Sequence, residues 1–270
     1  MKMKQMLLFA VTAFGVLSVL LPLSVRPAHA QAVFQAAGPT AASIQATVDA
    51  YRAALGDPNN GNTAGPLATG RREINWDGGG SDATTDPVTP FNVFLNTRGG
   101  QFTTPGTGLS QAPPSGGAQG GLAVLFNNPT YADIFTPFSA PRLFTPVDSN
   151  ITEGAFFVPG TNGATPATVS GFGAIFADVD KPNGKRSEKG VTKHSTLIEY
   201  FDADGGHLYT GFVPASPGDG ALSFFGIVFD DARIARVRIT TGDVAPGPDD
   251  GKKDIVMMDD FIYGEPQPLP

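Results

Sequence analysis

The sequence contains no cysteine, three histidines and a single tryptophan among its 270 residues. Without cysteine there can be no disulfide, no thiolate zinc site, no cysteine nucleophile and no haem attached through cysteine. The H-E-x-x-H signature of zinc proteases and the G-x-S-x-G elbow of serine hydrolases are absent as well. We therefore assign no catalytic residue, and we expect stability to come from a hydrophobic core to which 20 phenylalanines contribute.

Long apolar runs are equally scarce, because residues 6–23 form the only extended stretch that is apolar and uncharged. Lys2 and Lys4 precede this stretch, and the small residues Ala28 and Ala30 follow it at the positions that a signal peptidase reads. The pattern predicts a secretory leader, residues 1–30, that is cleaved after Ala30. We expect a secreted or periplasmic protein with no transmembrane segment after cleavage.

Basic residues are the minority charge, with 18 Lys and Arg against 25 Asp and Glu. The leader holds three of the basic residues (Lys2, Lys4 and Arg26) and no acid, so its removal lowers the net charge from −7 to −10. Such a charge opposes binding to nucleic acid, because polyanions need neutralisation by Lys and Arg. It suits neutral sugars, basic partners and cations, of which calcium is the one that prefers oxygen ligands.

The order of apolar residues predicts one helix and many strands. Ile44, Val48, Tyr51 and Leu55 fall at helical spacing between Ser43, a candidate N-cap, and Gly56, which ends the helix. Short apolar or alternating segments separated by turn residues predict the strands. These segments are residues 72–77, 142–144, 155–158, 169–176, 196–201, 207–213, 223–229, 233–239 and 254–263. We therefore predict an all-β fold, a jelly-roll-like antiparallel sandwich with one short N-terminal helix.

The predicted organisation has four parts. After the leader, residues 31–66 form the helix and a linker, and residues 67–265 form the sandwich domain. Residues of about 78–140, rich in Gly, Pro and Thr, form a long insertion that covers part of the domain, and residues 266–270 are a tail. In the segment 233–239, Ile234 is out of step with the residues that follow it, which indicates a bulge or a late strand start.

Four segments together resemble exported bacterial proteins of the PEP-CTERM type. They are GFGAIFADVD at 171–180, IEYFDADG at 198–205, IARVRIT at 234–240 and MDDFIYG at 258–264. The resemblance covers about residues 140–265, and it implies a jelly-roll ectodomain similar in architecture to carbohydrate-binding modules. The chain departs from that type after Glu265, where no apolar sorting helix or basic tail follows, so we expect plain secretion.

Acidic residues are the candidate metal ligands. Asp178 and Asp180 lie two residues apart, so on a strand both carboxylates leave the same face, and a bound cation relieves their repulsion. In jelly-roll sugar-binding modules, an Asp near the start of the last strand often helps to hold a structural calcium, which singles out Asp259 and Asp260. Glu73 and Asp77 belong to a strand expected beside the last one. These six residues are the candidate calcium ligands, and we expect some subset of them to hold the ion; the alternative is that they are solvated or turn-forming carboxylates.

Aromatic side chains are the candidate ligand-binding residues, because sugar sites stack rings against pyranose faces. We select Trp76, Tyr131 and Tyr209, although a tryptophan in such a strand is more often part of the core. The predicted function is an exported, non-catalytic binding or surface protein, whose partner is a glycan or cell-surface polymer. One alternative is a polysaccharide hydrolase or lyase, because paired carboxylates also cleave glycosidic bonds. The other is a purely structural envelope protein.

Overall fold

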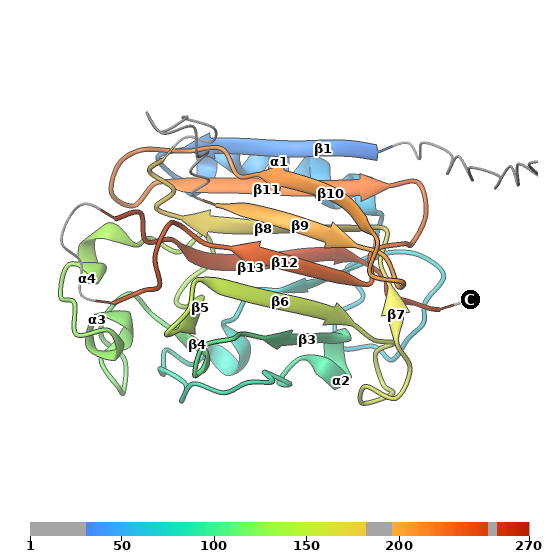
Figure 1. The fold of residues 1–270 in the computed structure, drawn as a ribbon, viewed down its shortest axis with the longest axis horizontal. Helices are drawn as coiled ribbons and strands as arrows, with labels where there is room; N and C mark the ends of the chain where they lie inside the picture. The colour runs from blue at the N-terminus through green and yellow to red at the C-terminus, as the bar shows by residue number, and fades with distance from the viewer. Residues whose placement is uncertain (1–30, 182–195, 248–252, 270) are drawn as a thin grey trace, which may run out of the picture.

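The computed structural model describes residues 31–181, 196–247 and 253–269 of the chain. Two antiparallel sheets pack face to face, with short helices at the margins (Figure 1), which confirms the predicted all-β antiparallel sandwich. The predicted leader lies outside the described residues. None of the helices in the described part of the chain has the length and apolar character needed to cross a membrane.

We call the first sheet the covered sheet. Its strands run in the order β1-β11-β8-β13-β5-β4, and β2 pairs with β13 beside β5. The strands are β1 Gln31–Gly38, β2 Arg71–Ile74, β4 Gly108–Ala112, β5 Leu143–Val147, β8 Gly171–Ala177, β11 Leu222–Phe229 and β13 Met257–Gly264. Every residue of β8 and β13 is buried, because one face packs on the second sheet and the other packs on helices.

We call the second sheet the open sheet, and its strand order is β10-β9-β12-β6-β3. The strands are β3 Gly100–Thr103, β6 Ile151–Phe156, β9 Leu197–Phe201, β10 His207–Phe212 and β12 Arg236–Thr240. Burial alternates along β6, β9 and β12, since one face meets the core and the other faces water. Two further short strands, β7 Ala167–Thr168 and β14 Gln267–Pro268, pair with each other.

The helix α1, Ala41–Leu55, lies across the outer face of the covered sheet (Figure 1). The predicted stripe of Ile44, Val48, Tyr51 and Leu55 is confirmed as its buried face. The predicted cap was wrong, because the side chain of Thr40 rather than Ser43 accepts the backbone N–H at the helix start, at 3.3 Å. The shorter helices are the 3-10 turn η1 Gly78–Gly80, α2 Leu95–Arg98, α3 Gly121–Leu125 and α4 Tyr131–Ile134.

Aromatic rings fill the space between the sheets. Trp76 stands at the centre, stacked on Phe144 with 3.8 Å between ring centroids and edge-on to Phe261 at 4.9 Å. A second core lies between the covered sheet and the helices α1, α3 and α4. Fully burying a large apolar side chain contributes about 1.5–3 kcal/mol, so these two layers are the main source of stability in a chain without disulfides.

The strands predicted from residue 142 onward correspond to β5, β6 and β8–β13, with shifted ends. The predicted late start at Ile234 is confirmed, because β12 begins at Arg236 and Ile234 forms only an isolated bridge with Val169. Five strands were missed. They are β1, which precedes the helix, β3 and β4, which lie inside the Gly, Pro and Thr-rich segment, and the two-residue strands β7 and β14.

Candidate functional site

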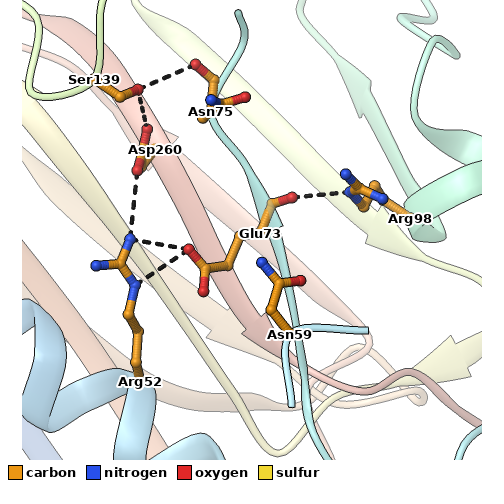
Figure 2. A pocket seen from close by; sticks show the side chains of 7 residues that line it. All are labelled: Arg52, Asn59, Glu73, Asn75, Arg98, Ser139 and Asp260. Carbon is orange, nitrogen blue, oxygen red and sulfur yellow. Dashed lines mark hydrogen bonds and ion pairs between the residues drawn. The ribbon is translucent and has the colours of Figure 1, made fainter. Parts of the chain in front are cut away.

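The pairing of β2 with β13 creates the candidate site. Glu73 lies opposite Ile262 in this register, so the carboxylate that leaves β2 comes close to the acidic start of the last strand. A cavity of about 280 Å³ opens here (Figure 2). Its lining is polar throughout: Arg52, Asn59, Glu73, Asn75, Arg98, Ser139 and Asp260.

Ser139 and Asp260 in the cavity lining belong to a cluster of carboxylates around the Ser139 hydroxyl, and the other two members, Asp77 and Asp259, do not line the cavity. The Ser139 Oγ lies 2.6 Å from Asp260 Oδ1, 3.1 Å from Asp77 Oδ2 and 3.4 Å from Asp259 Oδ1. It also lies 3.3 Å from the backbone carbonyl oxygen of Asn75. A serine hydroxyl has one proton to donate, so these four acceptor oxygens outnumber the proton available to them.

Burial raises the pKa of the Asp259 carboxyl well above its usual range, and the neighbouring Asp260 charge raises it further. The backbone N–H of Phe138 and that of Ser139 donate to Asp259 Oδ2, which lowers the pKa in part. Burial also raises the pKa of Asp260 and of Asp77. The pair Asp259 and Asp260 thus favours a shared proton, because two adjacent carboxylates in a buried site resist ionising together.

On the side of the helix, the guanidinium of Arg52 lies between two carboxylates (Figure 2). Its Nη2 is 2.9 Å from Glu73 Oε2 and 3.7 Å from Asp260 Oδ2. Glu73 also accepts from Arg71 Nε at 2.7 Å. Glu73 and Arg52 therefore neutralise each other's charge in the cavity wall. The ion pairs of Arg52 with Glu73 and Asp260 connect α1 to β2 and β13.

Of the six predicted metal ligands, Asp77, Asp259 and Asp260 meet at the Ser139 hydroxyl, and Glu73 is linked to Asp260 through Arg52. Asp178 and Asp180 do not join them. Asp180 instead accepts from the backbone N–H of Gly218, and its own N–H donates to Asp254 Oδ1. Asp178 follows β8, its backbone N–H bonded to the carbonyl of Ala221. Asp178 and Asp180 thus have partners of their own, because β8 and β13 carry their acidic residues to different surroundings, and metal binding by the remaining residues stays a prediction.

The oxygen-rich donor set around Ser139 has the chemistry that calcium prefers, namely carboxylates, a hydroxyl and a backbone carbonyl. In the conformation described, however, no group of three or more Asp, Glu or His side chains among residues 31–181, 196–247 and 253–269 has the arrangement of a metal site. A cation would therefore have to draw Asp77, Asp259 and Asp260 closer and displace the shared proton.

The predicted aromatic platforms have other roles. Trp76 is fully buried and donates from its indole N–H to the carbonyl of Asp259 at 2.9 Å. Tyr131 is fully buried, and its hydroxyl donates to the carbonyl of Gly247 at 2.8 Å. Both rings pack in the core and offer no face to a sugar. Tyr209 is half-buried on β10 of the open sheet and does not line the cavity.

Sequence reasoning missed five of the seven residues that line the cavity: Arg52, Asn59, Asn75, Arg98 and Ser139. Arg52 follows Tyr51 in the predicted helix, which indicates only that it flanks the buried stripe. Asn59 belongs to a turn, and Ser139 to an irregular segment, so neither has a periodic signal. Only the register of β2 on β13 and the docking of α1 bring them together.

Comparisons with protein-family models, with curated proteins and with solved structures find no match for the chain.

Proposed function

We propose that this chain is an exported, non-catalytic binding or surface protein, that its polar cavity binds a glycan, and that calcium stabilises one wall of the cavity. The observation that carries the proposal is the lining of the cavity, which consists entirely of amide, guanidinium, carboxylate and hydroxyl groups. Such groups both donate and accept hydrogen bonds, as the hydroxyls of a sugar require. The resemblance to PEP-CTERM ectodomains supports the same proposal.

The position of Arg52 favours binding over hydrolysis. A glycosidase needs one carboxyl as acid and another as base or nucleophile, with the glycosidic bond between them. Here the two carboxylates that line the cavity, Glu73 and Asp260, both have the Arg52 guanidinium beside them. An arginine in this place occupies the space between the two carboxylates that a glycosidic bond would need.

Binding can be tested with a glycan array and a matched pair of variants of the purified exported protein. Asn75→Ala removes an exposed amide from the cavity, whereas Asn92→Ala removes an exposed amide elsewhere. We expect the first to weaken binding by about tenfold, or about 1.4 kcal/mol, and the second to leave it unchanged. A protein that binds no glycan on the array would have a structural role instead.

Calcium can be tested by thermal melting with calcium and with chelator. If Asp77, Asp259 and Asp260 hold the ion, calcium at 100 times its Kd raises the free energy of unfolding by about 2.7 kcal/mol. The effect should grow from pH 5 to pH 8, since the ion competes with the proton that raised pKa values retain on Asp259 and Asp260. Identical melting curves at both pH values would remove calcium from the proposal.

Export predicts the first residue of the mature chain. Strand β1 begins at Gln31 and pairs with β11 along its whole length, from Gln31 opposite Phe229 to Gly38 opposite Leu222. Cleavage after Ala30 would leave this strand intact. Sequencing the N-terminus of the protein recovered outside the inner membrane should therefore give Gln31, and an uncleaved N-terminus would contradict the predicted leader.

A further inference from the structure

Arg98 differs from the other arginines around the cavity. It is the last residue of α2, its Nε donates to the backbone carbonyl of Glu73 at 3.0 Å, and its Nη1 donates to Asn62 Oδ1. Both partners are neutral. Within the part of the chain that the structure describes, no carboxylate oxygen lies within 4.0 Å of its guanidinium, although Arg52, Arg71 and Arg72 each have such a partner.

The carboxylates nearest to Arg98 already have their own cations. Glu73 bonds to both Arg52 and Arg71, and Glu265 forms a buried pair with Arg72. Burial lowers the pKa of the Arg98 guanidinium and the charge of Arg72 lowers it further, while Tyr263 and the more distant charge of Glu73 offset only part of this effect. A half-buried cation with neutral partners is costly, and an anionic group from outside would relieve that cost.

We propose that Arg98 binds the carboxylate of a sugar acid, so that the cavity selects a uronate residue of an acidic glycan. This inference rests on the proposed function and names its ligand class. A guanidinium presents paired donors that match a carboxylate, and it binds more strongly than neutral donors do. The exposed amides of Asn59 and Asn75 line the same cavity and are available to the ring hydroxyls (Figure 2).

Two further observations restrict the ligand. The cavity of about 280 Å³ is slightly smaller than the usual small-molecule site of about 300–1,000 Å³, which suits a single sugar residue. The mature chain has a predicted net charge of −10, derived from −7 by removal of three basic residues, and this charge repels dense polyanions. Isolated uronates among neutral sugars therefore fit better than a continuous acidic polymer.

The test compares acids with their neutral parents. Glucuronate and galacturonate are titrated against the purified exported protein by calorimetry, beside glucose, galactose and acetate. We expect each uronate to bind at least about tenfold more tightly than its neutral parent and than acetate. A trisaccharide with one uronate and a fully uronate trisaccharide then distinguish isolated from continuous acids, with the first expected to bind more tightly.

Three variants locate the effect. Arg98→Gln should abolish the preference for the acid while leaving the affinity for the neutral sugar within about twofold, since the carboxylate loses its cation and the amides of Asn59 and Asn75 remain. Arg98→Lys keeps the charge and should retain the preference at lower affinity, even if the glutamine variant fails to fold. Arg238→Gln is the control, because Arg238 lies on the open sheet 3.8 Å from Glu153 and does not line the cavity.

The outcomes separate the two proposals. Equal affinity for acids and neutral parents would overturn the uronate inference and leave glycan binding in place. Acetate binding as tightly as the uronates would also overturn it, because the sugar would then contribute nothing. If the Arg98→Gln variant still prefers the uronate over its neutral parent, the carboxylate binds at another residue and the inference is wrong. No binding of any sugar would overturn both proposals together.

Discussion

The two sheets are built from similar strands but differ in what lies on their outer faces. In the covered sheet, helix α1 and the segments of α3 and α4 pack on the outer face, and β8 and β13 are buried at every residue. In the open sheet the outer face meets water, and burial alternates residue by residue. The difference shows that coverage, rather than strand chemistry alone, decides where polar groups can lie.

Polar residues of the two sheets consequently have different partners. On the open sheet, Glu153 lies 3.2 Å from Arg236 and 3.8 Å from Arg238, and all three are partly exposed. In the covered sheet, Arg72 is 0% exposed and forms a two-pronged pair with Glu265, with both distances 2.6 Å. The candidate cavity lies where the coverage of this sheet ends, between α1 and β2.

The largest expected effect comes from breaking an ion pair in each sheet. Glu265→Gln leaves the buried charge of Arg72 without its counterion, which should lower the free energy of unfolding by about 3–5 kcal/mol. Glu153→Gln breaks a surface pair and should cost at most about 1 kcal/mol. Urea denaturation of both variants measures the contrast. Equal costs would show that the covered sheet admits water at Arg72.

The next contrast concerns an aromatic residue on each outer face. Tyr51 of α1 is fully buried against Gly173 and Gly226 of the covered sheet, whereas Phe201 lies half-exposed on the open sheet, beneath the Arg236 guanidinium at 4.0 Å. Tyr51→Ala should cost about 3 kcal/mol through the cavity it creates. Phe201→Ala should cost about 1 kcal/mol or less, chiefly the lost cation–π contact. A larger loss for Phe201 in chemical denaturation would mean that another surface covers the open sheet.

The sequence predicts the open sheet and the helix well for a physical reason. Both the alternation in Arg236–Thr240 and the 3.6-residue stripe of α1 arise because one face of the element is buried. Such periodic patterns can be recognised in the sequence. Continuous apolar runs such as Gly171–Ala177 also predict strands, but they do not reveal what covers the second face. The strand β1 was missed because most of its residues are exposed and its apolar residues, Ala32 to Phe34 and Ala36 to Ala37, do not alternate with polar ones.

The candidate site could be predicted only in part. Glu73, Asp77, Asp259 and Asp260 were selected because terminal strands of such sandwiches pair. The register of β2 on β13 places Glu73 and Asp260 in the cavity lining, and Asp77 and Asp259 contact Ser139 of that lining. The sequence does not predict the arginines and amides of the site, since Arg52 and Arg98 belong to helices far apart in the chain. Their convergence depends on tertiary packing, which leaves no local pattern in the sequence.

A glycine substitution probes the contact of helix and covered sheet at a finer scale. A Cβ atom on Gly226 would lie 2.8 Å from Tyr51 Cε2, so Gly226→Ala should displace α1 and cost about 1–3 kcal/mol. Ala155 faces outward on the open sheet, and Ala155→Val should change stability by no more than about 0.5 kcal/mol. Thermal melting distinguishes them. A neutral Gly226→Ala would indicate that α1 is packed loosely.

The smallest expected effect concerns the buried carboxyl pair of the covered sheet and has the opposite sign. Because burial raises the pKa of Asp259, the folded state retains a proton there. That contribution to stability is complete below the unfolded-state pKa of about 3.9 and is lost as the pH rises through the higher folded-state pKa. Asp259→Asn keeps an acceptor for the N–H groups of Phe138 and Ser139 and gives Asp260 a permanent donor.

In chelator, the Asp259→Asn variant and the native protein should therefore melt at similar temperatures near pH 4, where both carry a neutral group. The variant should melt higher by about 2–4 °C near pH 8, where the native pair is forced toward two charges. Glu153→Gln provides the carboxyl-to-amide control on the open sheet. Added calcium should raise the melting temperature of the native protein and not that of Asp259→Asn, since the amide removes a charged ligand. A variant that melts lower at every pH would show that Asp259 is ionised in the folded protein. The positive charge of Arg52, rather than a shared proton, would then keep Asp259 and Asp260 together.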